Sequence, residues 1–249
     1  MNRRFLISAL AALPFANSAR AATPWSAQFL AGGFDGKAYS AGLYVKLDQG
    51  WKTYWRNPGD AGIPPSITAA PNDNLANMII DFPLPLRIKD ESGEAFGYRD
   101  EVLFPLTITP KDLGLPLSVH FSSFFGVCQQ ICTPAKFEAM LNFSPKSAPT
   151  SDGAVIAKWR SLVPKTGSIA KTATVRDGLL RLDLTRQFSD IFIEGPERYY
   201  FGQPEFDQAG MNALFKIAGL KNDGDLKGVE LRITANANGP GLEQRVTVA

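Results

Sequence analysis

Histidine and cysteine are scarce in this chain of 249 residues, which contains only His120, Cys128 and Cys132. A structural zinc ion needs four ligands, usually cysteine and histidine, so this set is too small to hold one. Cu(I) accepts sulfur donors, and Met78 and Met140 would add thioethers to the cysteine pair, so a copper site stays open as an alternative. We otherwise expect neither a metal nor a cofactor.

The sequence also lacks clustered charge of one sign and, after its amino-terminal segment, any long apolar run. Lysine and arginine form no stripe and the formal net charge is +2, so no nucleic-acid partner is expected. A membrane-spanning helix needs roughly 18 consecutive apolar residues, and none follows the amino terminus. We therefore expect a mature chain without a transmembrane segment.

The amino terminus has the three parts of an export signal. Residues 1–4 are basic, residues 5–15 are apolar, and Ala19-Arg20-Ala21 has the small-x-small form of a cleavage site. A signal peptide at residues 1–21 predicts a periplasmic protein, exported by the general secretory route. Arg3 and Arg4 leave twin-arginine export as an alternative.

Cys128 and Cys132 are four residues apart, and this spacing limits the backbone that can join them. Bridged cysteines need Cα atoms roughly 4.4 to 6.8 Å apart. Four residues of a strand span about 13 Å, whereas one helical turn or a folded-back loop brings the two cysteines to about 6 Å. The pair must therefore lie on a turn.

The residues on both sides of this turn alternate between apolar and polar. This period of two at residues 118–127 and 136–143 predicts two strands that pair as a hairpin. Pro134 argues against the long helix that follows a thioredoxin-type motif. Closing so short a loop removes only about 2 kcal/mol of unfolded-state freedom, against about 4.7 kcal/mol for a hundred-residue loop. A redox-active pair is therefore favoured over a structural disulfide.

A cluster of serine, proline and glycine at residues 144–153 predicts a linker between two β domains. The fold class is therefore all-β, with two tandem antiparallel β-sandwiches at residues 22–148 and 153–249. The second contains neither cysteine nor histidine, which favours a structural or docking role. Strands are expected at residues 41–47, 102–108, 180–184, 191–193 and 229–233, and a short helix at residues 154–162.

Residues 50–65 are rich in aromatic and turn-forming side chains. On a strand, Trp51, Thr53 and Trp55 share one face, where aromatic rings usually serve packing, although a sugar-stacking platform is an alternative. Residues 57–60, Asn-Pro-Gly-Asp, are typical of a turn. We expect a core strand that runs into a rigid loop.

Three ordered segments resemble the amino-terminal periplasmic domain of the DsbD and ScsB family of thiol-disulfide reductases. They are residues 50–60, 97–105 and 127–134. The likeness covers roughly residues 25–143, and the following half is similar to the second sandwich of the ScsB branch. It implies immunoglobulin-like sandwiches and a cysteine pair that accepts electrons from a membrane partner and hands them to thioredoxin-like periplasmic proteins.

The resemblance also implies a role for each cysteine. Cys132 is similar to the cysteine that forms the mixed disulfide with a partner, and Cys128 to the one that resolves it. In some members a cap loop shields the cysteines with an aromatic ring. The corresponding stretch contains Asp90 and Glu91, and Phe96 is the candidate for the shielding ring.

Family members usually continue into a membrane electron carrier, and often into a thioredoxin domain, whereas this sequence ends at Ala249 with neither. We therefore expect a thiol-disulfide oxidoreductase whose partners are thioredoxin-like periplasmic proteins and a separate membrane thiol carrier. The alternative is a non-catalytic exported β-sandwich that binds a protein partner or Cu(I). No Lys, Arg or His lies within three residues of either cysteine, so the fold must supply any stabilisation of a thiolate.

Overall fold

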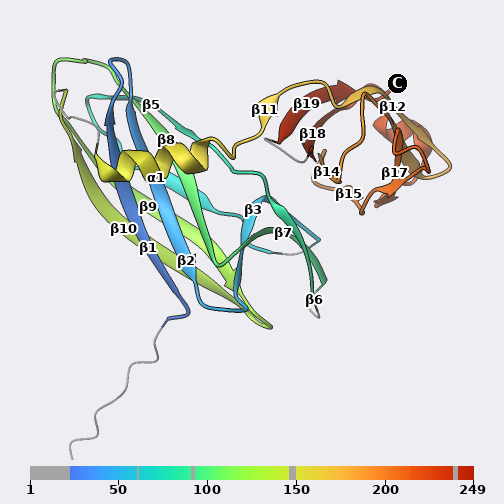
Figure 1. The fold of residues 1–249 in the computed structure, drawn as a ribbon, viewed down its shortest axis with the longest axis horizontal. Helices are drawn as coiled ribbons and strands as arrows, with labels where there is room; N and C mark the ends of the chain where they lie inside the picture. Colours follow the sequence, from blue (N-terminus) through green and yellow to red (C-terminus); the bar gives the residue numbers. More distant parts are fainter. Residues whose placement is uncertain (1–22, 61, 91–92, 146–149, 238–240) are drawn as a thin grey trace, which may run out of the picture.

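The computed structural model describes residues 23–60, 62–90, 93–145, 150–237 and 241–249. In this part of the chain, two β bodies are joined by the helix α1 (Ser151–Arg160), as Figure 1 shows. The predominantly β architecture expected from the sequence is confirmed. The expected signal peptide, residues 1–21, lies outside the described residues.

The first body consists of two sheets packed face to face. Its strands are β1 (Trp25–Phe34), β2 (Tyr39–Leu47), β3 (Lys52–Gly59), β4 (Ser66–Ala69), β5 (Leu75–Ile80), β6 (Leu86–Asp90), β7 (Gly93–Arg99), β8 (Glu101–Pro110), β9 (Leu117–Cys128) and β10 (Cys132–Phe143). One sheet has the order β1-β2-β8-β5 and the other the order β10-β9-β3-β7-β6, with β4 on β9. Side chains such as Leu43, Trp55, Phe104 and Phe121 fill the core between the sheets.

The second body has two further sheets and a core of its own. Its elements are β11 (Lys165–Thr166), β12 (Ala170–Arg176), β13 (Leu179–Leu184), β14 (Asp190–Glu194), β15 (Tyr200–Phe201), β16 (Glu205–Phe206), β17 (Asn212–Ala218), the 3₁₀ helix η1 (Asp223–Leu226), β18 (Glu230–Asn236) and β19 (Leu242–Thr247). The sheet orders are β11-β19-β18-β14 and β12-β13-β17-β15, with β16 on β17. The short pair β11–β19 is parallel and departs from the antiparallel pattern expected for this body.

The helix expected at residues 154–162 is present as α1, and it begins earlier because Thr150 caps it. The Thr150 hydroxyl accepts a hydrogen bond from the Gly153 amide at 3.2 Å and donates one to the Ala31 carbonyl at 2.7 Å. The helix lies across β1, β2 and β8 (Figure 1), where Ile156 packs with Leu30 and Leu103. It therefore packs on the first body. No helix within the described ranges is long and apolar enough to cross a membrane.

Strand β3 does not end at the turn expected over residues 57–60. Its pairing with β7 shifts register between Tyr54 and Gly59, so the extra residues form a bulge inside the strand. The turn chemistry is used within this bulge: the Asn57 side chain accepts a hydrogen bond from the Gly59 amide at 3.1 Å, and Gly59 has a φ of 87°. The bulge carries Arg56 and Asn57 to the second body, where Asn57 donates to the Ile193 carbonyl at 3.3 Å.

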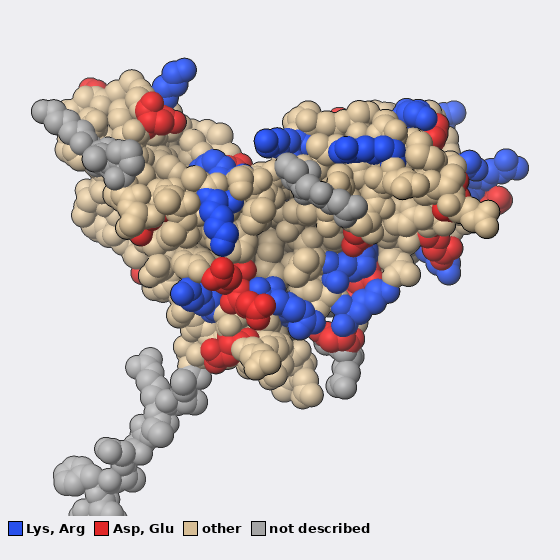
Figure 2. Space-filling view, in the orientation of Figure 1, with Lys and Arg blue, Asp and Glu red and all other residues tan. Residues whose placement is uncertain are grey.

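Two arginines of the first body bind carboxylates of the second. The Arg56 guanidinium contacts Glu194 at 2.7 Å and also Glu243. Arg87 of β6 makes a forked contact with Asp190, whose nearest oxygen is 3.0 Å from the guanidinium. On the face shown in Figure 2, side chains of both charge signs are interspersed where the bodies meet.

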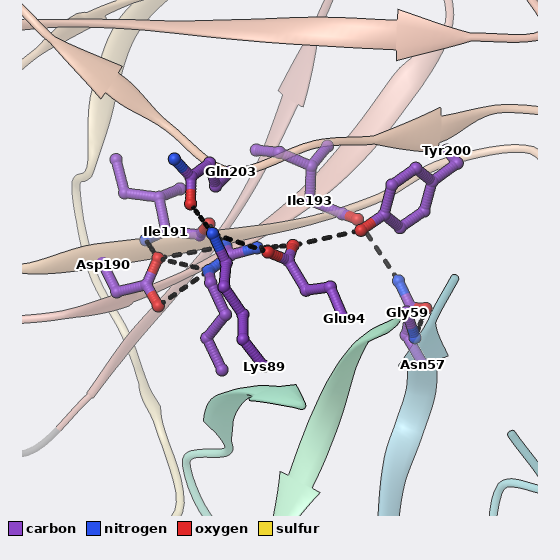
Figure 3. A network of polar contacts seen from close by, with 10 residues as sticks. Asn57, Gly59, Lys89, Glu94, Asp190, Ile191, Ile193, Tyr200 and Gln203 are labelled. Atoms are coloured by element: carbon purple, nitrogen blue, oxygen red, sulfur yellow. Dashed lines mark hydrogen bonds and ion pairs between the residues drawn. The ribbon is translucent and has the colours of Figure 1, made fainter. Parts of the chain in front are cut away.

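The contacts of Arg87 belong to a connected network, and Figure 3 labels its members Glu94, Asp190, Ile191 and Tyr200. The guanidinium also donates to the Ile191 carbonyl at 2.8 Å and pairs with Glu94, which accepts a hydrogen bond from the Tyr200 hydroxyl at 3.0 Å. Beneath it, Phe192 of β14 lies edge-on to Phe96 with ring centroids 5.1 Å apart. Apolar packing and paired charges together hold the two bodies against each other.

Candidate functional site

The two cysteines face each other across the end of the hairpin β9–β10. Cys132 is the Cα partner of Cys128 in the antiparallel register, and a disulfide joins them with the Cα atoms 4.1 Å apart. Residues 129–131 form the connecting loop. The expected turn and the expected hairpin are both confirmed.

The disulfide lies on the outer face of the six-stranded sheet. In β9 the odd-numbered residues, such as Phe121, Phe125 and Val127, point into the core, so Cys128 points away from it. Alternating burial nevertheless stops at the end of β9, where Cys128 is only 1% exposed because Tyr54 and Ala95 pack over it. Cys132, by contrast, is exposed. The two bridged cysteines therefore differ in access to solvent.

The Tyr54 hydroxyl lies against both sulfurs. Its oxygen is 2.8 Å from Cys128 Sγ, to which it donates, and 3.1 Å from Cys132 Sγ. Burial, with a contribution from the Asp90 carboxylate, raises the pKa of the Tyr54 phenol. The hydroxyl consequently keeps its proton at neutral pH and remains a donor to whichever sulfur carries charge.

Two glycines make room for this tyrosine ring. A Cβ atom at Gly62 would lie 2.3 Å from Tyr54 Cε1, and one at Gly126 would lie 3.0 Å from Cδ2. Gly62 also has a φ of +148°, which L side chains rarely adopt. Any side chain at Gly62 would push the ring, and with it the hydroxyl, away from the disulfide.

A buried lysine completes the site. Lys52 is the Cα partner of Cys128 in the β3–β9 register, so both side chains leave the same face of the sheet. Its side chain is 3% exposed, and Nζ lies 2.7 Å from Asp90 Oδ2 at the end of β6. The fold thus brings a cation beside the cysteines that no sequence neighbour supplies.

The proposed shielding residues have different positions. Asp90 borders the site through Lys52, whereas Glu91 lies outside the described residues. Phe96 is 1% exposed and packs in the core against Phe192. Because side chains alternate along β7, its neighbour Ala95 is the residue that packs on Cys128.

The residues considered for Cu(I) are spread over the first body. His120 and Met140 are paired at the far end of the hairpin, eight positions from each cysteine and so about 26 Å along the strands. Met78 belongs to β5 in the other sheet. No group of three or more His, Cys, Asp or Glu side chains that could hold a metal is found in the described ranges.

Sequence reasoning expected Trp51, Thr53 and Trp55 to share a packed face of β3, with a sugar platform as the alternative, and it assigned no role to the opposite face. Trp55 is fully buried, which confirms the core strand and leaves no ring face free for a sugar at that position. The residues that reach the disulfide, Lys52 and Tyr54, occupy the intervening positions. The same alternation that placed Trp51 and Trp55 on one face would have placed these two on the other, but it could not say what lay opposite them.

We expect a Tyr54→Phe variant to open its disulfide roughly tenfold more slowly with dithiothreitol, because a hydrogen bond to a charged group contributes about 1.5 to 3 kcal/mol. The variant keeps the ring between the two glycines, so its oxidised form should unfold at nearly the wild-type urea concentration. Tyr98→Phe is the matched control, since the Tyr98 hydroxyl donates to the Pro83 carbonyl on the core side. Equal opening rates in the two variants would show that the Tyr54 hydroxyl does not assist the opening of the disulfide.

Comparison with known proteins places this geometry in context. Residues 19–143 match the family described as thiol:disulfide interchange protein DsbD, N-terminal. That segment contains both cysteines and the residues that contact them. None of the curated proteins compared with the chain is similar enough to count as a match.

Solved structures give a likeness over nearly the whole chain. The crystal structure of the N-terminal periplasmic domain of ScsB from Proteus mirabilis is 20% identical, with a TM-score of 0.74 over 95% of this chain and 96% of that one. The two-body fold is therefore similar to that of the ScsB domain. The Pseudomonas aeruginosa CupB2 chaperone is 9% identical over 84% of this chain and 93% of that one, with a TM-score of 0.24, too low to bear on the fold.

Proposed function

The chain belongs to the family of the amino-terminal domain of the thiol:disulfide interchange protein DsbD, and from this premise we propose that it is a periplasmic thiol-disulfide oxidoreductase. It passes reducing equivalents through Cys128 and Cys132, to or from thioredoxin-like proteins. Its immunoglobulin-like first domain, residues 22–148, carries the reaction, and residues 153–249 form a second such domain. A separate membrane thiol carrier is the proposed electron donor.

The unequal exposure of the two cysteines supports this proposal most directly. A thiolate of a reduced donor attacks the exposed Cys132 Sγ, the Cys128–Cys132 bond breaks, and its electron pair stays on Cys128. The donor's second thiol, once deprotonated, then attacks the donor sulfur of the mixed disulfide, which forms the donor's disulfide, breaks the bond to Cys132 and releases Cys132 as a thiolate. The donor loses two electrons and two protons, and Cys128 and Cys132 gain them as two thiols.

Delivery to an oxidised partner runs the same steps in reverse. The Cys132 thiolate attacks the partner's disulfide, and Cys128 then resolves the mixed disulfide from beneath. Cys128 needs no access to the partner, because its target is the sulfur of Cys132, beside which it is held. Tyr54 is within hydrogen-bond distance of both sulfurs and so can stabilise either thiolate as it forms.

A redox titration tests the proposed function. We expect the mature protein to interconvert between disulfide and dithiol forms without unfolding, with a midpoint potential above about −300 mV. Alkylation of free thiols read by mass, with circular dichroism on the same samples, measures both properties. A midpoint below that value, or loss of the fold on reduction, would indicate a structural disulfide instead.

The alternative, a non-catalytic exported β-sandwich that binds a protein or Cu(I), has less support. Cu(I) would have to be held by the cysteines without the histidine and methionines, which lie elsewhere in the first body. A disulfide that closes a short loop between one buried and one exposed cysteine suits exchange, in which only the exposed member must meet a partner.

A further inference from the structure

Four side chains form a row across neighbouring strands beside the disulfide. Cys132 of β10 is paired with Cys128 of β9, Cys128 with Lys52 of β3, and Lys52 with Arg99 of β7. Directly opposed residues of antiparallel strands project on the same face of the sheet, with Cβ atoms about 4.5 to 5.5 Å apart. Lys52 is therefore the immediate cross-strand neighbour of the buried cysteine.

Because Lys52 is buried, water screens its charge poorly, and the charge can act on neighbouring groups. A lysine that is 3% exposed is rarely tolerated unless its ammonium is paired, and here Nζ contacts Asp90 at 2.7 Å. Asp90 is also close enough to Tyr54 to raise the pKa of its phenol, and the Tyr54 oxygen is 2.8 Å from Cys128 Sγ. The Asp90 carboxylate is thus close enough to act electrostatically on Cys128 Sγ, the sulfur that must become an anion.

Two opposite effects act on a Cys128 thiolate. The Asp90 carboxylate disfavours it, because like charges in a poorly solvated site repel each other strongly. The Lys52 ammonium favours it and also neutralises Asp90. Among the described residues, the other groups beside Cys128 are the neutral Tyr54 hydroxyl and Cys132, while Arg99 lies one strand beyond Lys52 and is exposed to solvent, where its charge is screened.

We propose that Lys52 is a positioning residue of the exchange reaction, which cancels the charge of Asp90 and thereby stabilises the Cys128 thiolate that leaves when the disulfide opens. This inference rests on the proposed function. A better leaving thiolate departs faster, so Lys52 sets the rate at which an attacking donor opens the bond. Lys52 has this effect through its charge and need not touch the reacting sulfurs.

The thiol of Cys128 can be titrated alone in a Cys132→Ser background. With ¹³C-labelled cysteine, the Cβ chemical shift followed against pH reports its pKa. We expect Lys52→Met to leave roughly tenfold less thiolate at a given pH, because the Asp90 charge then loses the Lys52 ammonium. Lys52→Arg should restore the titration, since the guanidinium keeps the positive charge.

Replacing Asp90 gives a result of opposite sign. Asp90→Asn removes the opposing charge and should lower the pKa of Cys128, and the pair Lys52→Met with Asp90→Asn should return it close to the parent value. This second variant keeps the test valid if the lysine variant is too unstable to titrate. Arg99→Met is the matched control, a cation in the same row but exposed, and should change the titration little.

In the chain with both cysteines, Lys52→Met should slow opening by dithiothreitol about threefold to tenfold, and Asp90→Asn should speed it. An unchanged Cys128 titration in both variants, or a double variant no closer to the parent than Lys52→Met alone, would overturn the inference. Dithiothreitol is a small dithiol that needs no docking surface. Failure of exchange with thioredoxin-like proteins would therefore count against the proposed function and leave this result standing.

Discussion

A Cys128→Ser variant is expected to accumulate mixed disulfides with thioredoxin-fold proteins, at least tenfold above the level in a Cys132→Ser variant. The first leaves the exposed Cys132 free to attack and removes the neighbour that would resolve the product. The second leaves only Cys128, which is 1% exposed beneath Tyr54 and Ala95. Non-reducing electrophoresis after mixing with an oxidised, purified thioredoxin, followed by mass spectrometry, measures the trapped fraction.

The variant lacking both cysteines is the control for non-covalent association. Equal trapping by the two single variants would show that burial does not decide which sulfur reacts. Preferential trapping by Cys132→Ser would reverse the two roles. Either result would contradict the assignment made from the family and supported by the exposure of the residues.

Removal of Arg87 is expected to cost roughly 3 to 5 kcal/mol in the free energy of unfolding, because it removes the cation that two largely buried carboxylates share. The Arg87 side chain is 10% exposed and pairs with both Asp190 and Glu94, so Arg87→Ala takes the guanidinium from Asp190 and leaves Glu94 with the more exposed Lys89, 3.4 Å away. Urea unfolding followed by tryptophan fluorescence measures the loss. We also expect the single transition to broaden or divide as the bodies uncouple.

The matched control for Arg87 is an arginine with an equally close but exposed partner. Arg245 lies 2.6 Å from Glu230, with both side chains more than half exposed. Exposed pairs contribute about 0 to 1 kcal/mol, so Arg245→Ala should hardly change the unfolding curve. Similar small losses in both variants would mean that the ion pairs of Arg87 contribute little, and that the joint is held by its other contacts, those of Arg56 and Phe192.

The hairpin with the cysteines was predictable because its information is local. Alternation over residues 118–127 and 136–143 and the spacing of two cysteines are enough to place β9, β10 and the turn between them. The capped helix is also encoded locally, by the threonine at its start. These features need no knowledge of what lies across the sheet.

The surroundings of the disulfide were not predictable in the same way. Tyr54 and Cys128 are 74 residues apart in sequence, and only the register of β3 with β9 brings them together. Phe96 illustrates the converse error, since an aromatic residue in the right segment lies on the core side of β7. A shift of one position on a strand exchanges the two faces, and sequence pattern alone does not fix the register of distant strands.

Strand β3, with its bulge, makes the two halves of the protein depend on each other. Three consecutive residues of this strand have different neighbours: Tyr54 contacts the disulfide, Trp55 packs in the core, and Arg56 binds the second body. Cutting the chain after α1 would uncover Trp55 and Phe96, which Phe192 now covers, and would leave Arg56 and Arg87 without their acidic partners from the second body. An isolated first half would expose an apolar, positively charged surface, and Arg56 in that surface is only two residues along the strand from Tyr54, which contacts the sulfurs. We therefore expect its redox chemistry to differ from that of the intact protein.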